Sequence, residues 1–147
     1  MTSALAYLAE HHVMTLATHG ADGPWAAAVF YVNDGYALLF LSSPESRHAR
    51  DFASNPRVAA TVQEDYAAWA EIRGVQLEGI VREVTGAEAA RARALYGAKF
   101  PVVGTPGEAP APIAAALARA RWYALAPLRL HFIDNAIAFG HRQEVAL

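Results

Sequence analysis

Short runs of β-branched and apolar residues, separated by clusters of turn-forming residues, make up the chain between residues 13 and 41. The runs cover 13–18, 25–32 and 36–41, and the clusters between them are 19–24 and 33–35. The second cluster holds an Asp-Gly pair, which favours a tight hairpin because glycine accepts a positive φ. Connections this short join antiparallel neighbours. The sequence therefore predicts three consecutive antiparallel strands by residue 41.

Helix and strand signals alternate along the rest of the chain. Ser43 can cap a helix whose first position is Pro44, and this helix ends before Pro56 because the residue preceding a proline avoids the helical region. Thr85 and Glu88 have the spacing of a capping box that opens another helix. We therefore expect helices over 2–12, 43–54, 85–99 and 113–121, and further strands over 57–63, 72–84, 122–134 and 137–144.

Glycines and prolines add detail to this pattern. Gly74 and Gly79 fall inside the expected strand over 72–84, where glycines mark bulges or close approaches of two backbones. Residues 100–112 contain four Pro and two Gly and are expected to form a mobile loop rather than a domain boundary, since only about 35 residues follow them. Strands near both ends of the chain indicate a barrel that closes on itself.

Composition limits the classes of function. The 147 residues suit a single domain, and 12 Lys+Arg against 14 Asp+Glu give a net charge of -2. The absence of cysteine excludes disulfides and thiolate metal sites. The near-neutral balance, without a basic block, argues against nucleic-acid and membrane partners, and neither a membrane span nor a secretory signal is expected. We expect a cytoplasmic protein whose redox chemistry, if any, comes from a bound cofactor.

The segment between residues 42 and 48 is the most informative for chemistry. Ser42 and Ser43 end an expected strand, and Ser46, Arg47 and His48 lie at the expected helix N-terminus. Backbone N–H groups and the helix dipole favour an anion there, and an arginine can add a bidentate contact to phosphate. In the alternative interpretation, the serines only cap the helix while the arginine and the histidine lie in water.

The order of these pieces resembles the flavin-mononucleotide-binding split barrels of the pyridoxamine-phosphate oxidase-like family. In that family a strand ends in a hydroxyl-bearing turn, a Ser-Arg-Lys-like triplet opens a helix, and Asn-Pro ends the helix before the next strand. The resemblance covers nearly the whole chain and is greatest to a small, uncharacterised bacterial subfamily. The motifs that carry it are Ser42-Ser43, Ser46-Arg47-His48, Asn55-Pro56-Arg57-Val58, His12-Val13-Met14-Thr15, Ile72-Arg73-Gly74-Val75-Gln76 and Phe139-Gly140.

The resemblance implies a fold, a cofactor and a partner. The fold is mainly β within the α+β class, an antiparallel split β-barrel with peripheral helices, formed by residues 1–147 as one domain. The cofactor is flavin mononucleotide (FMN), bound between the subunits of a homodimer, with the backbone of residues 26–30 along the isoalloxazine ring and the partner subunit's Arg142 against the flavin. The implied cofactor-binding residues are Ala26, Ala27, Ala28, Val29, Phe30, Ser42, Ser43, Ser46, Arg47, His48 and Arg142.

Departures from the family pattern bear on activity. His48 replaces the usual lysine, so its charge is expected to depend on pH near 6.5. Ala138 and Gly140 stand where the parent oxidases hold their substrate with an arginine and a histidine, and a lysine expected near 30–31 is missing. We therefore expect an FMN-dependent oxidoreductase other than a true pyridoxamine-phosphate oxidase, one that passes electrons between a reduced nicotinamide and an unknown small acceptor.

A second function from a different class stays open at this point. The same barrel could be a non-catalytic binding module for haem, a deazaflavin or another ligand. No side chain is assigned a catalytic role. No metal ligand is assigned either, because His11 and His12 are adjacent and project apart on a helix, while His131 and His141 are expected at the surface.

Overall fold

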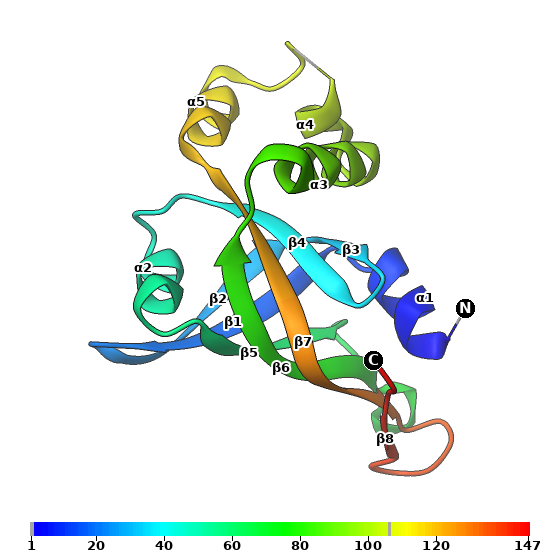
Figure 1. Cartoon of the computed structure of the whole chain (residues 1–147). Helices are drawn as coiled ribbons and strands as arrows, with labels where there is room; N and C mark the ends of the chain where they lie inside the picture. Colours follow the sequence, from blue (N-terminus) through cyan, green and yellow to red (C-terminus); the bar gives the residue numbers. More distant parts are fainter. Residues whose placement is uncertain (1, 106) are drawn as a thin grey trace.

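The computed structural model describes residues 2–105 and 107–147, which form one bent antiparallel sheet surrounded by helices (Figure 1). The strands are β1 Val13–Gly20, β2 Gly23–Phe30, β3 Val32–Asp34, β4 Ala37–Ser42, β5 Arg57–Gln63, β6 Arg73–Glu83, β7 Arg121–Asp134 and β8 Arg142–Glu144. The helices are α1 Ser3–Glu10, α2 Arg47–Ser54, α3 Gly86–Lys99, α4 Pro101–Gly104 and α5 Ala111–Arg119, with a 3-10 turn, η1, at Trp69–Glu71. No helix within the described ranges is long and apolar enough to cross a membrane.

The strand order defines the barrel. The ladders run β2-β1-β5-β6-β7-β4-β3, and β8 adds to β7. The path ends at β2 and β3, and these two strands are joined through Tyr31 rather than through a ladder in the described structure. The barrel is therefore split, and the predicted fold class is confirmed.

The prediction of one strand over 25–32 is wrong in one respect, because the chain leaves the sheet at Tyr31 and forms two strands, β2 and β3. Tyr31 is completely buried and its hydroxyl donates to the Leu8 carbonyl at 2.8 Å. This anchor turns the chain from one end of the sheet to the other. The predicted hairpin at 33–35 is confirmed, since β3 pairs with β4, but β4 then pairs with β7 rather than with β2.

Apolar side chains alternate along the strands and fill the barrel. On β5, for example, Val58, Ala60 and Val62 are buried while the residues between them are exposed or half-buried. Helix α1 covers the barrel with Tyr7 and Leu8. Full burial of a leucine-sized side chain contributes about 1.5–3 kcal/mol, so this core is the main source of stability.

A second, smaller core lies between α3 and the sheet. It consists of Val32, Leu39, Val84, Ala92, Tyr96, Trp122 and Ala124. Helices α3, α4 and α5 gather over this end of the molecule (Figure 1, top), whereas α2 lies to the side of β1 and β2.

One predicted helix start is wrong, and one predicted capping interaction does not form. Helix α2 begins at Arg47, because the Ser43 carbonyl accepts from both the N–H and the hydroxyl of Ser46 and forms a turn, and Ser46 then caps the helix by accepting from the Ala49 N–H at 3.3 Å. The capping box of α3 does not form. Thr85 is the N-cap residue of α3, as predicted, but its side chain makes no capping hydrogen bond, and Glu88 pairs with Arg82 instead of reaching back.

The glycine prediction for 72–84 is confirmed. The β6–β7 register shifts at Gly79, where an added Cβ would lie 2.3 Å from the Ala126 carbonyl oxygen. An added Cβ at Gly74 would lie 2.8 Å from the Val62 carbonyl oxygen. Both glycines therefore permit close approach of a neighbouring backbone.

Two C-terminal expectations need correction. The last strand is only β8, because residues 135–141 form a turn in which Asn135 Oδ1 accepts from the Gly140 N–H. The loop expected over 100–112 contains α4 and the first turn of α5; Pro106 lies outside the described residues.

Candidate functional site

Helix α2 is fixed against the β1–β2 hairpin by a buried carboxylate. Asp51, only 7% exposed, accepts a hydrogen bond from the Thr18 hydroxyl at 2.8 Å. Gly20 makes room for it, since a Cβ there would lie 2.1 Å from Asp51 Oδ1. A buried charge is tolerated only when it is hydrogen-bonded. This contact therefore sets the position of the helix and of the residues at its N-terminus.

Arg47 joins the two predicted halves of the cofactor site. Its guanidinium lies 4.2 Å from the centroid of the Trp25 ring, and its Nη2 donates to the Asp22 carbonyl at 3.2 Å. Its Nε is buried and has no hydrogen-bond partner among residues 2–105 and 107–147. Leaving a buried donor unsatisfied costs about 1–3 kcal/mol. An acceptor atom of a bound ligand at this point would remove that cost.

Ser42, Ser46 and His48 form a hydrogen-bonded cluster beside Arg47. His48 Nε2 lies 2.7 Å from the Ser42 hydroxyl and 3.3 Å from the Ser46 hydroxyl. Burial lowers the pKa of His48 below its ordinary value of 6.5, although the nearby Asp51 carboxylate partly opposes this. The expectation of titration near 6.5 is therefore corrected. A neutral imidazole shares a hydrogen bond with the Ser42 hydroxyl, in which either group can be the donor, and adds no charge at neutral pH.

Ser43 lies at the turn before α2, where its hydroxyl accepts from the Glu45 N–H at 3.2 Å. Together with Ser42 it lines a cavity of about 560 Å³ between the end of β4 and α5. Helix α5 has no buried residue, and its apolar side chains at 113, 116 and 117 line this cavity. The volume is within the range of about 300–1,000 Å³ that small-molecule sites occupy.

Residues 26–30 of β2 offer main-chain groups rather than functional side chains. Ala26, Ala28 and Phe30 are exposed, whereas Ala27 packs on the core and Val29 is buried. The strand pairs only with β1 and lies at the edge of the sheet. An edge strand leaves a row of backbone N–H and C=O groups unpaired. A planar ligand beside the small side chains can use these groups.

Arg142 is not brought to this site within one chain. It lies on β8, and five ladders separate β8 from β2 along the sheet, a path of about 24 Å at roughly 4.8 Å per ladder. In Figure 1, β8 and α2 accordingly lie at opposite sides of the molecule. The structure thus gathers the predicted residues of α2, β2 and the β4 end, and it leaves Arg142 apart.

The positions that distinguish the parent oxidases lie in the turn before β8. Ala138 and Gly140 are both exposed, and Gly140 has a φ of +75°.

His11 lies away from the proposed site. Its ring stacks on the Tyr7 ring with 3.8 Å between the centroids, and its Nε2 lies 3.3 Å from Glu64 Oε2. These contacts tie α1 to the loop after β5.

Sequence reasoning missed three residues that shape the site. Trp25 carries the Arg47 guanidinium, while Asp51 and Thr18 fix α2. An aspartate such as Asp51, in a short helix after a Ser-Arg pair, has no sequence pattern that would mark it as buried or functional. Only the pairing of β1 with β2 shows that Trp25 and the N-terminus of α2 are neighbours.

The fold and the site together define an antiparallel split-barrel protein with an anion-compatible helix N-terminus beside an open sheet edge. A family model described as pyridoxamine 5'-phosphate oxidase matches residues 2–134. A UPF0306 protein of Klebsiella pneumoniae is 33% identical over 138 residues, which are 92% of this chain and 86% of that protein. The chain belongs to the pyridoxamine 5'-phosphate oxidase family, in a bacterial subgroup with the UPF0306 proteins.

Solved structures share this fold at low sequence identity. A haem-binding protein from Mycobacterium smegmatis superposes with a TM-score of 0.73 at 24% identity, over 99% of this chain and 59% of that one. HutZ, the haem storage protein from Vibrio cholerae, superposes with a TM-score of 0.69 at 20% identity, over 85% of this chain and 88% of its own.

Proposed function

We propose that the protein binds FMN, with the phosphate at the N-terminus of α2 and the ring along β2. The buried Nε of Arg47, which has no partner in the described part of the chain, carries this proposal, since it needs an acceptor at the point where α2 meets β2. Ser43 and the first N–H groups of α2 supply further donors, because these N–H groups lack intrahelical acceptors. His48 contributes hydrogen bonding without charge at neutral pH.

A bound flavin supplies the redox chemistry, and the protein supplies binding and orientation. The edge of β2 positions the ring through main-chain groups, and Ala26 and Ala28 allow its close approach. When bound, the flavin would carry electrons from a reduced nicotinamide to a small acceptor. Ala138 and Gly140 offer no cation for a substrate phosphate, so pyridoxamine phosphate is not the expected substrate.

The proposed site needs two copies of the chain. Arg142 is five ladders away from β2 in its own chain, so the proposal takes the partner subunit's Arg142, which the family resemblance implies, as the residue against the flavin. An isologous two-fold dimer brings one such residue to each of two sites. This supports a homodimer with the cofactor between the subunits.

A second candidate is a non-catalytic haem-binding module. It is supported by the haem-binding and haem-storage proteins that share the fold. A deazaflavin is a third possible ligand for the same barrel. The absorption spectrum and the mass of the ligand that co-purifies separate these candidates, since haem gives a Soret band and FMN gives the two flavin bands.

Titration of FMN into ligand-free protein tests the proposal. Arg47→Ala is expected to remove about 2–3 kcal/mol of binding, which weakens affinity about 30- to 150-fold. Loss of the Trp25 contact changes the unfolding free energy of the ligand-free protein by no more than about 1 kcal/mol. Arg50→Ala is the matched control, because Arg50 is exposed on the same helix. Equal FMN affinity in the wild type and Arg47→Ala would refute the phosphate site.

A further inference from the structure

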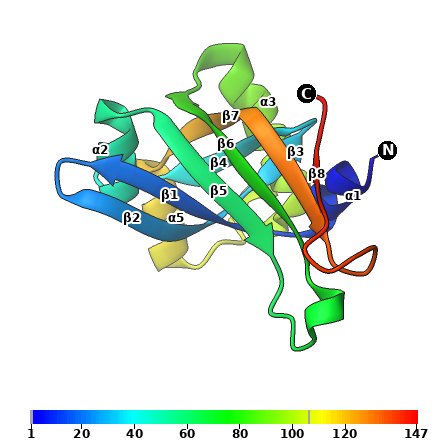
Figure 2. The ribbon, with the colours of Figure 1, turned by 90° about the horizontal axis from the view of Figure 1, so that it is seen from below.

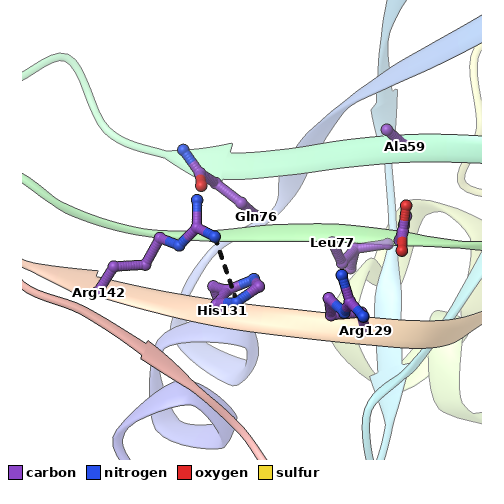
Figure 3. Close-up of a pocket in the computed structure, with 7 residues that line it drawn as sticks. Ala59, Gln76, Leu77, Arg129, His131 and Arg142 are labelled. Atoms are coloured by element: carbon purple, nitrogen blue, oxygen red, sulfur yellow. Dashed lines mark hydrogen bonds between the residues drawn. The ribbon is translucent and has the colours of Figure 1, made fainter.

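A polar cleft opens on the outer face of the sheet where β5 to β8 run side by side (Figure 3). Its volume is about 280 Å³. Gln76 faces His131 across the β6–β7 ladder, and Glu78 faces Arg129 two residues further along. The residues that line the cleft and matter here are Ala59, Gln76, Glu78, Arg129, His131 and Arg142.

The two ends of the cleft differ in charge. At one end Arg129 Nε lies 3.4 Å from a Glu144 oxygen, and Glu78 Oε1 lies 3.7 Å from Arg57 Nη2, so the charges compensate. At the other end Arg142 has no carboxylate within 4.0 Å in the described part of the chain. The cleft therefore carries one uncompensated guanidinium.

Hydrogen-bonding groups from three strands converge at the Arg142 end. Figure 3 shows the Arg142 side chain reaching from β8 over β7, with its guanidinium between the Gln76 amide of β6 and the His131 ring of β7. Arg142 Nη2 lies 3.5 Å from His131 Nε2. The small side chain of Ala59 on β5 borders the open space. A guanidinium presents a planar fork of donors that matches the oxygens of a carboxylate or a phosphate.

We propose that this cleft binds the carboxylate or phosphate group of a small molecule, with Arg142 as the principal contact and Gln76 and His131 beside it. In the proposed dimer this cleft lies beside the partner's flavin, so we assign the anionic group to the electron acceptor, with the Arg142 fork able to face both. This assignment to the acceptor rests on the proposed function. Binding of the anion itself does not, because every group involved belongs to one face of one chain.

The test uses inorganic phosphate and malonate as probes, measured without flavin. An Arg47→Ala background removes the other anion site, so that binding reports on the cleft alone. We expect both calorimetry and the shift of the His131 ring resonances to show binding with a Kd of about 1 mM or tighter. Arg142→Ala and Arg142→Gln, added to that background, are expected to weaken binding at least tenfold. Arg93→Ala, which removes the same charge elsewhere on the surface, is expected to leave it unchanged.

The outcomes separate this inference from the proposed function. Tighter binding of phosphate than of malonate indicates a phosphorylated ligand, and the reverse order indicates a carboxylic acid. Either result supports the inference that the cleft binds an anion. Anion binding that depends on Arg142 in a protein that fails to bind FMN also supports the cleft and refutes only the flavin site. Equal binding with and without Arg142, or none at millimolar concentration, overturns the inference.

Discussion

At the scale of single residues, His48 shows how burial changes the role of a family position. Its imidazole is held between two serine hydroxyls, and burial lowers its pKa below 6.5. Well above pH 6.5 the ring is neutral in both the folded and the unfolded protein. Below that pH the unfolded chain takes up the proton first, so the unfolding free energy falls as the pH drops toward the lower folded-state pKa.

His48→Gln is expected to remove this pH dependence while keeping an amide near Ser42. Urea unfolding of both proteins at pH 7.5 and pH 5 measures the difference, and a proton NMR titration of the His48 ring measures its pKa directly. His19→Gln is the control, because His19 is exposed on β1. A His48 ring that titrates at or above 6.5, or equal pH slopes for the wild type and His48→Gln, would contradict the burial argument.

At the scale of elements, the position of α2 depends on the contact between Asp51 and Gly20. Gly20→Ala places a Cβ against the Asp51 carboxylate and is expected to cost about 1–3 kcal/mol of unfolding free energy. Adding Asp51→Ala removes the clash, so the double variant should lose less than the sum of the two single losses, by at least about 0.5 kcal/mol. Denaturant unfolding of the four proteins measures this coupling.

Gly23→Ala separates this clash from backbone strain. Gly23 has a φ of +93° and open space around its Cβ position, so its substitution strains the turn without touching Asp51. Its loss of stability should therefore add to that of Asp51→Ala. Additive losses for Gly20→Ala and Asp51→Ala would show that Asp51 moves away without cost and does not fix the helix.

The elements also show which features the sequence could predict. Strand β5 appears at the expected bounds because its alternating apolar residues are local information. The sequence places the start of α2 too early because Ser43 and Ser46 are both good N-cap residues. Only the turn between them, which the three-dimensional structure shows, decides which of the two caps the helix. The break at Tyr31 was missed because it depends on a hydrogen bond to α1. The Ser-Arg-His segment was predictable from its motif, whereas the Trp25 and Asp51 contacts required the three-dimensional pairing of β1, β2 and α2.

At the scale of the whole molecule, the separation of Arg142 from β2 predicts the assembly. The proposed flavin site needs both, so the protein is expected to be a dimer of about twice 15.8 kDa. Light scattering at low micromolar concentration measures the mass. Arg47→Ala is the control, because it is expected to weaken FMN binding while leaving the hydrophobic core unchanged. A stable species of 15.8 kDa with FMN bound would contradict the two-chain site.

The pairing of β4 with β7 has a consequence for synthesis on the ribosome. Residues 38–42 of β4 meet residues 121–125 of β7, so about 80 residues must be added before this edge finds its neighbour. At about 5–20 residues per second this takes roughly 4–16 s. During that time an apolar strand edge stays open on the nascent chain, and it is there that a chaperone is expected to act.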